Sequence, residues 1–188
     1  MNRKLLAPLV LAAIVPALQG CFPLAVTGLG GAALMAGDRR TAGIYIEDEN
    51  NEWKVLGRLR QDNRGAYVNA TSFNRRVLLT GQAPTDDEKK RIEDLVRGIE
   101  NVREVVNEMT VAPVSSLTTR GNDALITSNV KARMVNNQKF SPNHVKVVTE
   151  NNVVYLMGLV SQAEGDAAAE LARTASGVSR VVKVFEYR

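Results

Sequence analysis

Residue types that usually carry catalysis or covalent cross-links are scarce in this chain of 188 residues. Cys21 is its one cysteine, so no disulfide can form within the chain. His144 is its one histidine, and no second histidine or further cysteine completes the ligand set of a zinc-type site. We therefore expect no metal and no cofactor. Since His144 follows Pro142 and Asn143, we expect it in a solvated loop.

Aromatic residues and charge of one sign are also limited. Aromatics make up 5% of the chain against 45% hydrophobic residues, which predicts a core of Val, Leu, Ile and Ala. A net charge of +4 without a concentrated basic patch does not indicate a nucleic-acid partner. Residues 41–110 hold 11 basic and 13 acidic side chains, whereas residues 120–188 hold 9 basic and 6 acidic ones. The second half is therefore the better candidate for an anionic partner.

Long hydrophobic runs are missing too. The longest apolar segment runs from Leu5 to Leu18 and is interrupted by Pro8 and Pro16. It is shorter than the roughly 20 residues that span a bilayer, so we do not expect a permanent transmembrane helix. Two basic residues precede it and small residues follow it, which is the layout of a secretory signal. We assign residues 1–20 to a signal peptide.

The apolar segment ends in Leu18-Gln19-Gly20-Cys21, which resembles the bacterial lipobox. In that class of signal the cysteine thiol takes a diacylglycerol, the chain is cut before it, and the new amine is acylated. The resemblance implies lipidation at Cys21, with palmitate-type chains that anchor by about 0.8 kcal/mol per buried CH2. The alternative is an ordinary signal peptide with an incidental cysteine. Residues 21–43, rich in Gly and Ala, are then expected to be a tether.

An internal repeat follows the tether. The stretch "RRVLLTGQAPTDDEKKRIEDLVRGIENVREVVNEM" aligns with "NVVYLMGLVSQAEGDAAAELARTASGVSRVVKVFEY", and Gly81 falls on Gly158. The match predicts two similar units over residues 44–112 and 121–188, with a joint at residues 113–120.

Each unit is predicted to be a helix, a hairpin, a second helix and a final strand. The hairpins turn at asparagines, which tolerate positive φ, and capping boxes start the second helices. The elements expected are helices at about 48–60 and 123–136, strands 67–73 and 145–149, turns Asn74-Arg75 and Asn151-Asn152, strands 77–80 and 153–157 that end at Gly81 and Gly158, capping boxes Thr85–Glu88 and Ser161–Glu164, and strands 102–111 and 178–187. The third strand should return by a right-handed crossover. The fold class is α+β, with two αββαβ units, each a three-stranded mixed sheet with two helices.

Two such units behind a lipobox resemble the BON-domain family, and especially the dual-BON outer-membrane lipoproteins of Gram-negative bacteria. The stretches that carry the resemblance are "RRVLLTGQAP", "VREVVNE", "VKVVTENNVVYLMGLVSQAEGDAAAELA", "SGVSRVVKVFEY" and, in the tether, "DRRTAG". The resemblance implies a periplasmic setting, binding of anionic phospholipid and no catalysis. Phe22 follows Cys21. By similarity to proteobacterial lipoproteins, the absence of Asp at this position favours export to the outer membrane, where the domains would face the periplasm.

The helix predicted at 123–136 has two apolar stripes at 100° per residue. Ile126, Val130 and Met134 form one stripe, which we expect to pack on the helix's own sheet. The other stripe has a basic edge and fits an anionic bilayer surface. We predict lipid binding by Leu125, Ser128, Asn129, Lys131, Ala132, Val135 and Asn136. Two alternatives stay open: the second stripe packs against the first unit, or a protein partner docks there.

The first helix of the first unit differs, because Trp53, Val55, Leu56 and Leu59 form a single broad apolar face. One face suffices for its own sheet, so the site is assigned to the second unit. Paired carboxylates such as Asp86-Asp87 indicate a helix N-terminus rather than a catalytic pair. We predict a non-enzymatic lipoprotein that binds anionic phospholipid and supports outer-membrane integrity. The alternatives are a protein-binding scaffold for envelope, cell-wall or division machinery and, third, a cell-wall enzyme.

Overall fold

The computed structural model describes residues 37–61 and 65–188, and Gly37–Arg188 form one compact unit. The predicted signal peptide and Cys21 lie outside the described residues. The first repeat consists of α3 (Ala42–Gln61), β1 (Tyr67–Phe73), β2 (Arg76–Ala83), α4 (Asp86–Arg97), β3 (Glu104–Asn107) and β4 (Thr110–Val111). The second consists of α5 (Leu117–Val135), the 3-10 helix η2 (Pro142–His144), β5 (Val145–Glu150), β6 (Val153–Val160), α6 (Gln162–Arg173) and β7 (Arg180–Tyr187).

Both repeats have the predicted αββαβ order and a mixed sheet, which confirms the α+β class. β1 is antiparallel to β2, and β3 and β4 run parallel to β2. β5 is antiparallel to β6, and β7 runs parallel to β6. The last strand of the first repeat, predicted as continuous over 102–111, is interrupted. Asn107 Oδ1 accepts a hydrogen bond from Met109 N at 3.2 Å, and this local turn separates β3 from β4.

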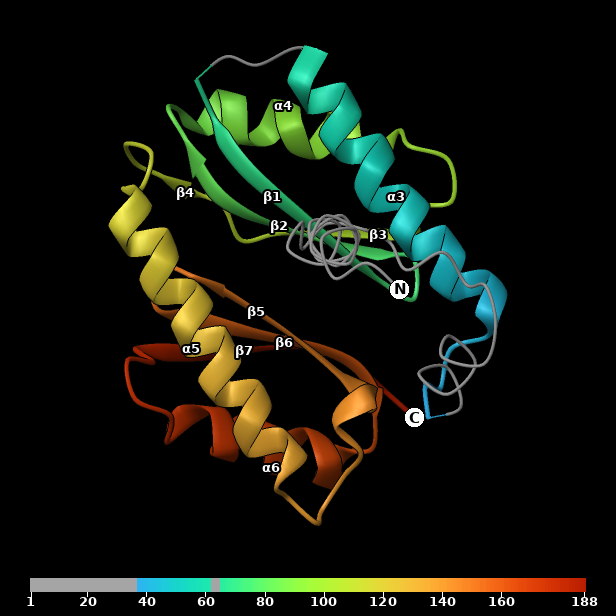
Figure 1. The fold of residues 1–188 in the computed structure, drawn as a ribbon. Coiled ribbons are helices and arrows are strands. Elements are labelled where there is room, and N and C mark those ends of the chain that lie inside the picture. Colours follow the sequence, from blue (N-terminus) through green and yellow to red (C-terminus); the bar gives the residue numbers. More distant parts are fainter. Residues whose placement is uncertain (1–36, 62–64) are drawn as a thin grey trace, which may run out of the picture. The chain divides into compact units, whose positions relative to one another are not determined.

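The two sheets pack face to face, and the helices cover their outer faces (Figure 1). Alternation along the strands produces this arrangement, because neighbouring side chains point to opposite sides. In β2, Val77 and Leu79 join the cluster beneath the helices, whereas Leu78 packs with Tyr155 and Met157 of β6. The two repeats therefore share a third apolar cluster between their sheets.

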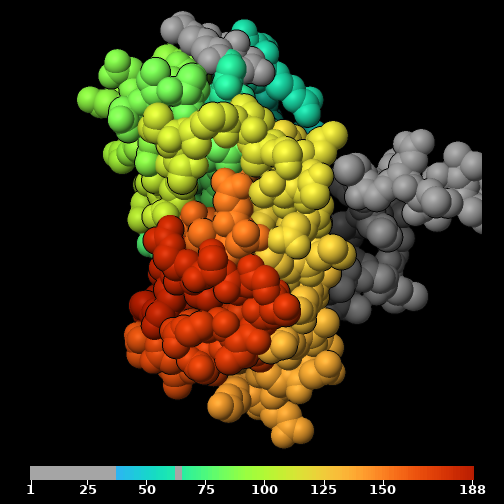
Figure 2. Space-filling view, turned by 90° about the vertical axis from the view of Figure 1, so that its left-hand side faces the viewer, coloured from blue at the N-terminus to red at the C-terminus, as the bar shows by residue number. Residues whose placement is uncertain are grey.

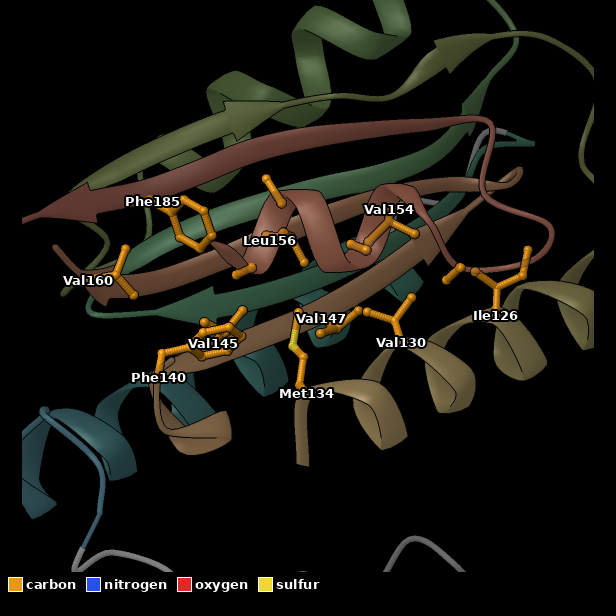
Figure 3. Packing of buried hydrophobic residues seen from close by; sticks show 14 residues of the cluster. Ile126, Val130, Met134, Phe140, Val145, Val147, Val154, Leu156, Val160 and Phe185 are labelled. Atoms are coloured by element: carbon orange, nitrogen blue, oxygen red, sulfur yellow. The ribbon is translucent and has the colours of Figure 1, made fainter. Parts of the chain in front are cut away.

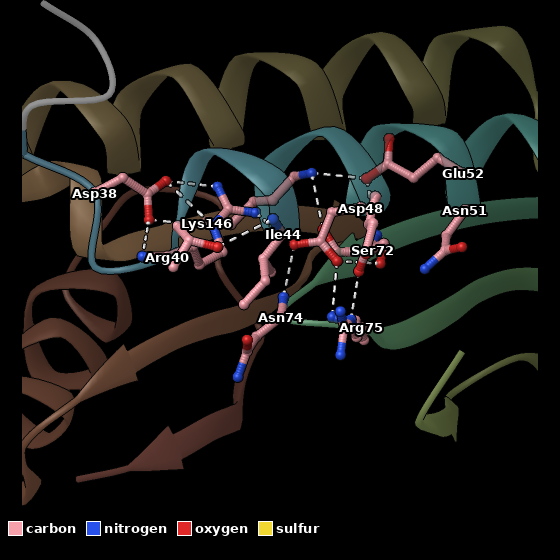
Figure 4. A network of polar contacts seen from close by, with 12 residues as sticks. Asp38, Arg40, Ile44, Asp48, Asn51, Glu52, Ser72, Asn74, Arg75 and Lys146 are labelled. Carbon is pink, nitrogen blue, oxygen red and sulfur yellow. Dashed lines mark hydrogen bonds and ion pairs between the residues drawn. The ribbon is translucent and has the colours of Figure 1, made fainter. Parts of the chain in front are cut away.

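The hairpin turns form as the asparagines predict. Asn74, Arg75, Asn151 and Asn152 all have φ between 49° and 64°. In addition, a buried aspartate on the first helix of each repeat holds the turn. Asp48 accepts hydrogen bonds from the backbone amides of Asn74 and Arg75 at 2.7 Å each (Figure 4). Asp123 does the same for Asn151 and Asn152, at 2.9 and 2.8 Å. We did not predict this contact from the sequence.

Gly81 and Gly158, which occupy matching positions in the two repeats, do not end their strands. We predicted that strands end there, but β2 continues to Ala83 and β6 to Val160. A Cβ on Gly81 would lie 2.0 Å from the carbonyl oxygen of Tyr67, and one on Gly158 would lie 2.3 Å from that of His144. These glycines therefore permit the close approach of the paired strand's backbone.

The ends of the second helices follow the predicted signals. Ser161 Oγ accepts from Glu164 N at 3.3 Å, and the Glu164 carboxylate accepts in return from Ser161 N at 2.8 Å, a complete capping box. Thr85 Oγ1 accepts from Glu88 N at 3.2 Å, which is one half of the capping box predicted there, and the Glu88 carboxylate accepts from Arg91 at 2.8 Å. The left-handed residues after these helices are Asn101, with φ 68°, and Gly177, with φ 86°.

The first helices begin earlier than predicted, so the tether and the joint are shorter. α3 starts at Ala42, inside the predicted tether, and α5 starts at Leu117, inside the predicted joint. Ser116 caps α5, because its Oγ accepts from Thr119 N at 3.1 Å. The predicted helix start at Asp123 is therefore wrong, because Asp123 is a buried residue in the second turn of α5.

Arg39 and Arg40 also belong to the folded unit rather than to a tether. Arg39 donates to both carboxylate oxygens of Glu164 at 2.7 Å and to the carbonyl oxygen of Leu159 at 2.9 Å. Arg40 donates to Asp48 at 2.8 Å, and its guanidinium carbon lies 4.0 Å from the ring centre of Phe73. The two arginines therefore bind the entering chain to the second repeat and to the first, respectively.

Candidate functional site

One face of α5 is fixed by the core of the second repeat. Ile126, Val130 and Met134 are buried and belong to the main cluster of that repeat. Figure 3 shows these three side chains pointing from α5 toward the strands, where they meet Val147 and Val154. The predicted core stripe is thus confirmed, and it determines which side of the helix faces outward.

The second stripe of α5 is exposed. Leu125 is 72% exposed and Val135 is 66% exposed. The exposed predicted residues are Leu125, Ser128, Lys131, Ala132, Val135 and Asn136. Asn129 is half-buried, and its Oδ1 accepts a hydrogen bond from Arg133 at 3.3 Å. The alternative that Leu125 and Val135 pack against the first repeat is therefore wrong.

The exposed stripe is longer than predicted. Because α5 begins at Leu117, two further turns extend it, and Leu117 is 81% exposed. The Ser116 cap was the sequence signal that could have revealed them. Within the stripe, the hydroxyl of Ser128 donates to the carbonyl oxygen of Ala124 at 2.9 Å, so this polar group is satisfied inside the helix. Figure 2 shows α5 as a yellow ridge along one side of the molecule.

The charge displayed by α5 is positive. Its one acidic residue, Asp123, is buried against the hairpin turn. Lys131 is exposed beside the stripe. Arg133 donates to the carbonyl oxygen of Thr174 at 3.0 Å, which keeps its charge near the same end of the helix. An apolar ridge bordered by cations is suited to an anionic surface.

The apolar face predicted for α3 is confirmed for Val55 and Leu59, which pack in the core of the first repeat, and is wrong for Trp53. Trp53 is 59% exposed, and Ile46, two turns earlier, is 56% exposed. The buried side of α3 carries Asp48 and Asn51 in addition to Val55. It is largely polar because Asp48 binds the hairpin turn and Ser72 Oγ, the latter at 2.8 Å. Because polar residues occupy this inner face, Ile46 and Trp53 remain exposed on the opposite side of the helix.

A recess of about 430 Å³ lies between α3 and α5. Tyr45 and Glu49 contribute from α3, and Lys131 and Val135 contribute from α5. Arg40, where the chain enters the folded unit, also lines it. The exposed stripe of α5 is therefore continuous with a hollow whose other wall belongs to the first repeat.

His144 is not the solvated loop residue that we expected, because its side chain is only 15% exposed. It lies beside Glu164, with Nδ1 3.7 Å from the carboxylate. Burial, together with the nearby positive charge of Arg39, lowers the pKa of His144 below its ordinary value. Hydrogen bonds from Arg39 and, to a smaller extent, from Ser161 lower the pKa of Glu164 to about 2, although partial burial acts in the opposite direction.

This arrangement predicts a specific acid sensitivity. The pKa of Glu164 is about 2 in the folded chain, against an ordinary value of 4.5, so the unfolded chain binds more protons between these pH values. Stability from this group is therefore present above pH 4.5 and is lost as the pH falls toward 2. Arg39→Gln removes the main cause. We expect the variant to be less stable than wild type at pH 7, by an amount that shrinks as the pH falls from 4.5, measured by urea denaturation. A difference independent of pH would contradict this assignment.

The described residues offer no metal centre. Across 37–61 and 65–188, no cluster of three or more His, Cys, Asp and Glu side chains is placed to hold an ion. None of the helices in these ranges has the length and hydropathy that a bilayer span requires.

Comparison with known proteins agrees with this architecture. A family model described as BON domain matches residues 47–113 and 122–188. The chain is 42% identical over 173 residues to an outer membrane lipoprotein, DolP, of Haemophilus influenzae, covering 90% of each chain. It is 37% identical over 153 residues to a 21 kDa hemolysin of Actinobacillus pleuropneumoniae, covering 80% of this chain and 79% of the relative. It is 28% identical over 144 residues to osmotically-inducible protein Y of Escherichia coli, covering 74% and 72%.

Proposed function

This chain belongs to the dual BON-domain lipoprotein family of the outer membrane, and from that premise we propose that it binds anionic phospholipid bilayers through α5 of its second BON domain. The observation that carries the proposal is the exposure of Leu125 and Val135 on a helix whose other face is fully used by the core. An uncovered apolar ridge on a folded domain marks an interaction site.

The binding mechanism follows from the two components of the ridge. Leu117, Leu125 and Val135 enter the boundary between headgroups and acyl chains, where each large apolar side chain gains up to about 1.5–3 kcal/mol on burial. Lys131 remains at the headgroup level and contributes about 1 kcal/mol against an anionic surface. The activity is binding without catalysis.

The anchor and the helix have separate roles in this proposal. Signal-peptide removal after residue 20 and acylation of Cys21 would hold the chain permanently in the outer membrane, facing the periplasm. α5 would then select the lipid composition, because only an anionic surface attracts Lys131 and its neighbours. A two-domain unit that is held to the outer membrane both by its lipid anchor and by α5 would support the integrity of that membrane.

A vesicle flotation experiment tests the proposal. The fragment 37–188 is the appropriate one, because Arg39 and Arg40 belong to the folded unit. We expect it to float at low salt with phosphatidylglycerol vesicles but not with phosphatidylcholine vesicles, and to be released as salt is raised. Absence of flotation with both vesicles would contradict lipid binding and would favour a protein partner for the exposed ridge.

A further inference from the structure

We propose that α3 of the first BON domain forms a second membrane contact, in which Trp53 and Ile46 enter the same anionic bilayer surface as α5. This inference rests on the proposed function and extends it from one helix to two. It gives a role to the one tryptophan of the chain, which stands 59% exposed on a helix whose inner face is largely polar.

The two helices lie at the same edge of the paired sheets. α3 packs over β1 and α5 packs over β5, the outer strands on that side. β1 lies across from β5, because Asn69 donates to Glu150 at 3.0 Å. Lys146 of β5 also reaches Glu52 of α3 at 2.7 Å. Figure 1 accordingly shows α3 and α5 in front of the strands, with α4 and α6 behind.

The recess between the helices confirms that they are neighbours at the surface. Tyr45 and Glu49 of α3 and Lys131 and Val135 of α5 border one hollow. α3 and α5 are therefore adjacent where the first turns of one meet the last turns of the other. Val135 of α5 and Tyr45 of α3 thus border the same hollow from its two walls.

The outer side of α3 carries the two exposed apolar residues. Ile46 and Trp53 are seven positions apart, which places them on one face at 100° per residue. That face is opposite the buried Asp48 and Val55. Tryptophan is suited to the membrane interface, since its ring is largely apolar and its indole N–H can remain at the headgroup level.

Charge favours a bilayer as the occupant of this face. Two acidic residues of α3 are paired, Glu52 with Lys146 and Glu47 with Arg75. Glu49 shares the recess with Lys131. The exposed cations at the end of the helix are Lys54, Arg58 and Arg60. Trp53 therefore stands beside cations, which is the setting expected of an interfacial anchor.

The entry point of the chain supports the same occupant. The folded unit begins at Gly37, and Arg40 lines the recess between α3 and α5. Residues 22–36 lie between Cys21 and this point. An anchor at Cys21 would therefore be joined to the folded unit beside the recess that α3 and α5 border.

Because Trp53 is the one tryptophan, its fluorescence reports directly on this face. The full chain, purified from membranes and reconstituted, is compared in vesicles of phosphatidylglycerol and of phosphatidylcholine whose acyl chains carry bromine. We expect a blue shift and loss of most Trp53 emission with phosphatidylglycerol, and a much smaller loss with phosphatidylcholine. Equal emission in the two vesicles would overturn the inference.

Two matched variants separate this inference from the proposed function. Trp53→Phe with Leu125→Trp moves the reporter to α5, and Trp53→Phe with Lys90→Trp moves it to an exposed position on α4. If the tryptophan at position 125 is quenched but the one at position 53 is quenched no more than the one at position 90, the α3 contact is overturned and the α5 proposal stands. Absence of quenching at position 125 would overturn the α5 proposal. Equal quenching at all three positions would show that no particular face of the protein contacts the bilayer, and would overturn both proposals.

Discussion

Replacing Asp48 by alanine is expected to lower the free energy of unfolding by about 3–5 kcal/mol, a value typical of breaking a buried charge network. The buried Asp48 carboxylate accepts from Ser72 Oγ, from the amides of Asn74 and Arg75, and from Arg40. Alanine would leave these donors without their acceptor in the interior (Figure 4). Equilibrium denaturation of the fragment 37–188 in urea measures the effect.

The second repeat supplies the matched comparison. Asp123 accepts from two backbone amides, those of Asn151 and Asn152, so Asp123→Ala is expected to cost less than Asp48→Ala. Glu47→Ala, which removes an exposed ion pair at the neighbouring position, is expected to change the stability much less than Asp48→Ala, because solvent screens the pair. A loss below 1 kcal/mol for Asp48→Ala would show that the turn is held by other contacts.

The repeated strands and turns were predictable because their signals are local. Each hairpin is specified by asparagines next to β-branched residues, and the positive φ of Asn151 and Asn152 follows from that chemistry. The parallel third strand follows from the helix between it and the hairpin. Alternation then determines which face of each sheet is covered by helices, as Val77 and Leu78 illustrate.

The inner face of α3 was not predictable from periodicity alone. Periodicity assigns large apolar side chains to the core, and it therefore placed Trp53 inside. The structure uses Asp48 there, because a hairpin turn far along the chain needs an acceptor. Alignment of the repeats contained the signal: Asp48 precedes the buried Val55 by seven residues, and Asp123 precedes the buried Val130 by seven.

The candidate site was predictable in pattern but not in extent. Two apolar stripes on one helix cannot both pack against the same sheet. The exposure of Leu125 shows that no other part of the folded unit covers the second stripe there. The contribution of α3 depends on how the two sheets stack, which brings Lys146 to Glu52. Contacts between repeats leave no periodic signal in the sequence, so this part of the site required the structure.

Leu125→Asp is expected to weaken binding to phosphatidylglycerol vesicles about 100-fold, because about 2 kcal/mol of apolar burial and about 1 kcal/mol of charge attraction are lost together. Leu125 is 72% exposed, so the free energy of unfolding should stay within about 0.5 kcal/mol of wild type. Vesicle flotation over a lipid titration measures the affinity, and urea denaturation measures the stability.

Neighbouring substitutions separate the causes of this loss. Leu125→Asn removes the apolar contact without adding charge and should lose about 30-fold, whereas Lys131→Glu should lose affinity that depends on salt. Ile126→Asp, one position along on the buried side of α5, and Val55→Asp on α3 should unfold the domain instead. If Leu125→Asp binds as tightly as wild type while the protein remains folded, the exposed ridge of α5 does not enter the membrane, and its apolar surface must be covered by a protein.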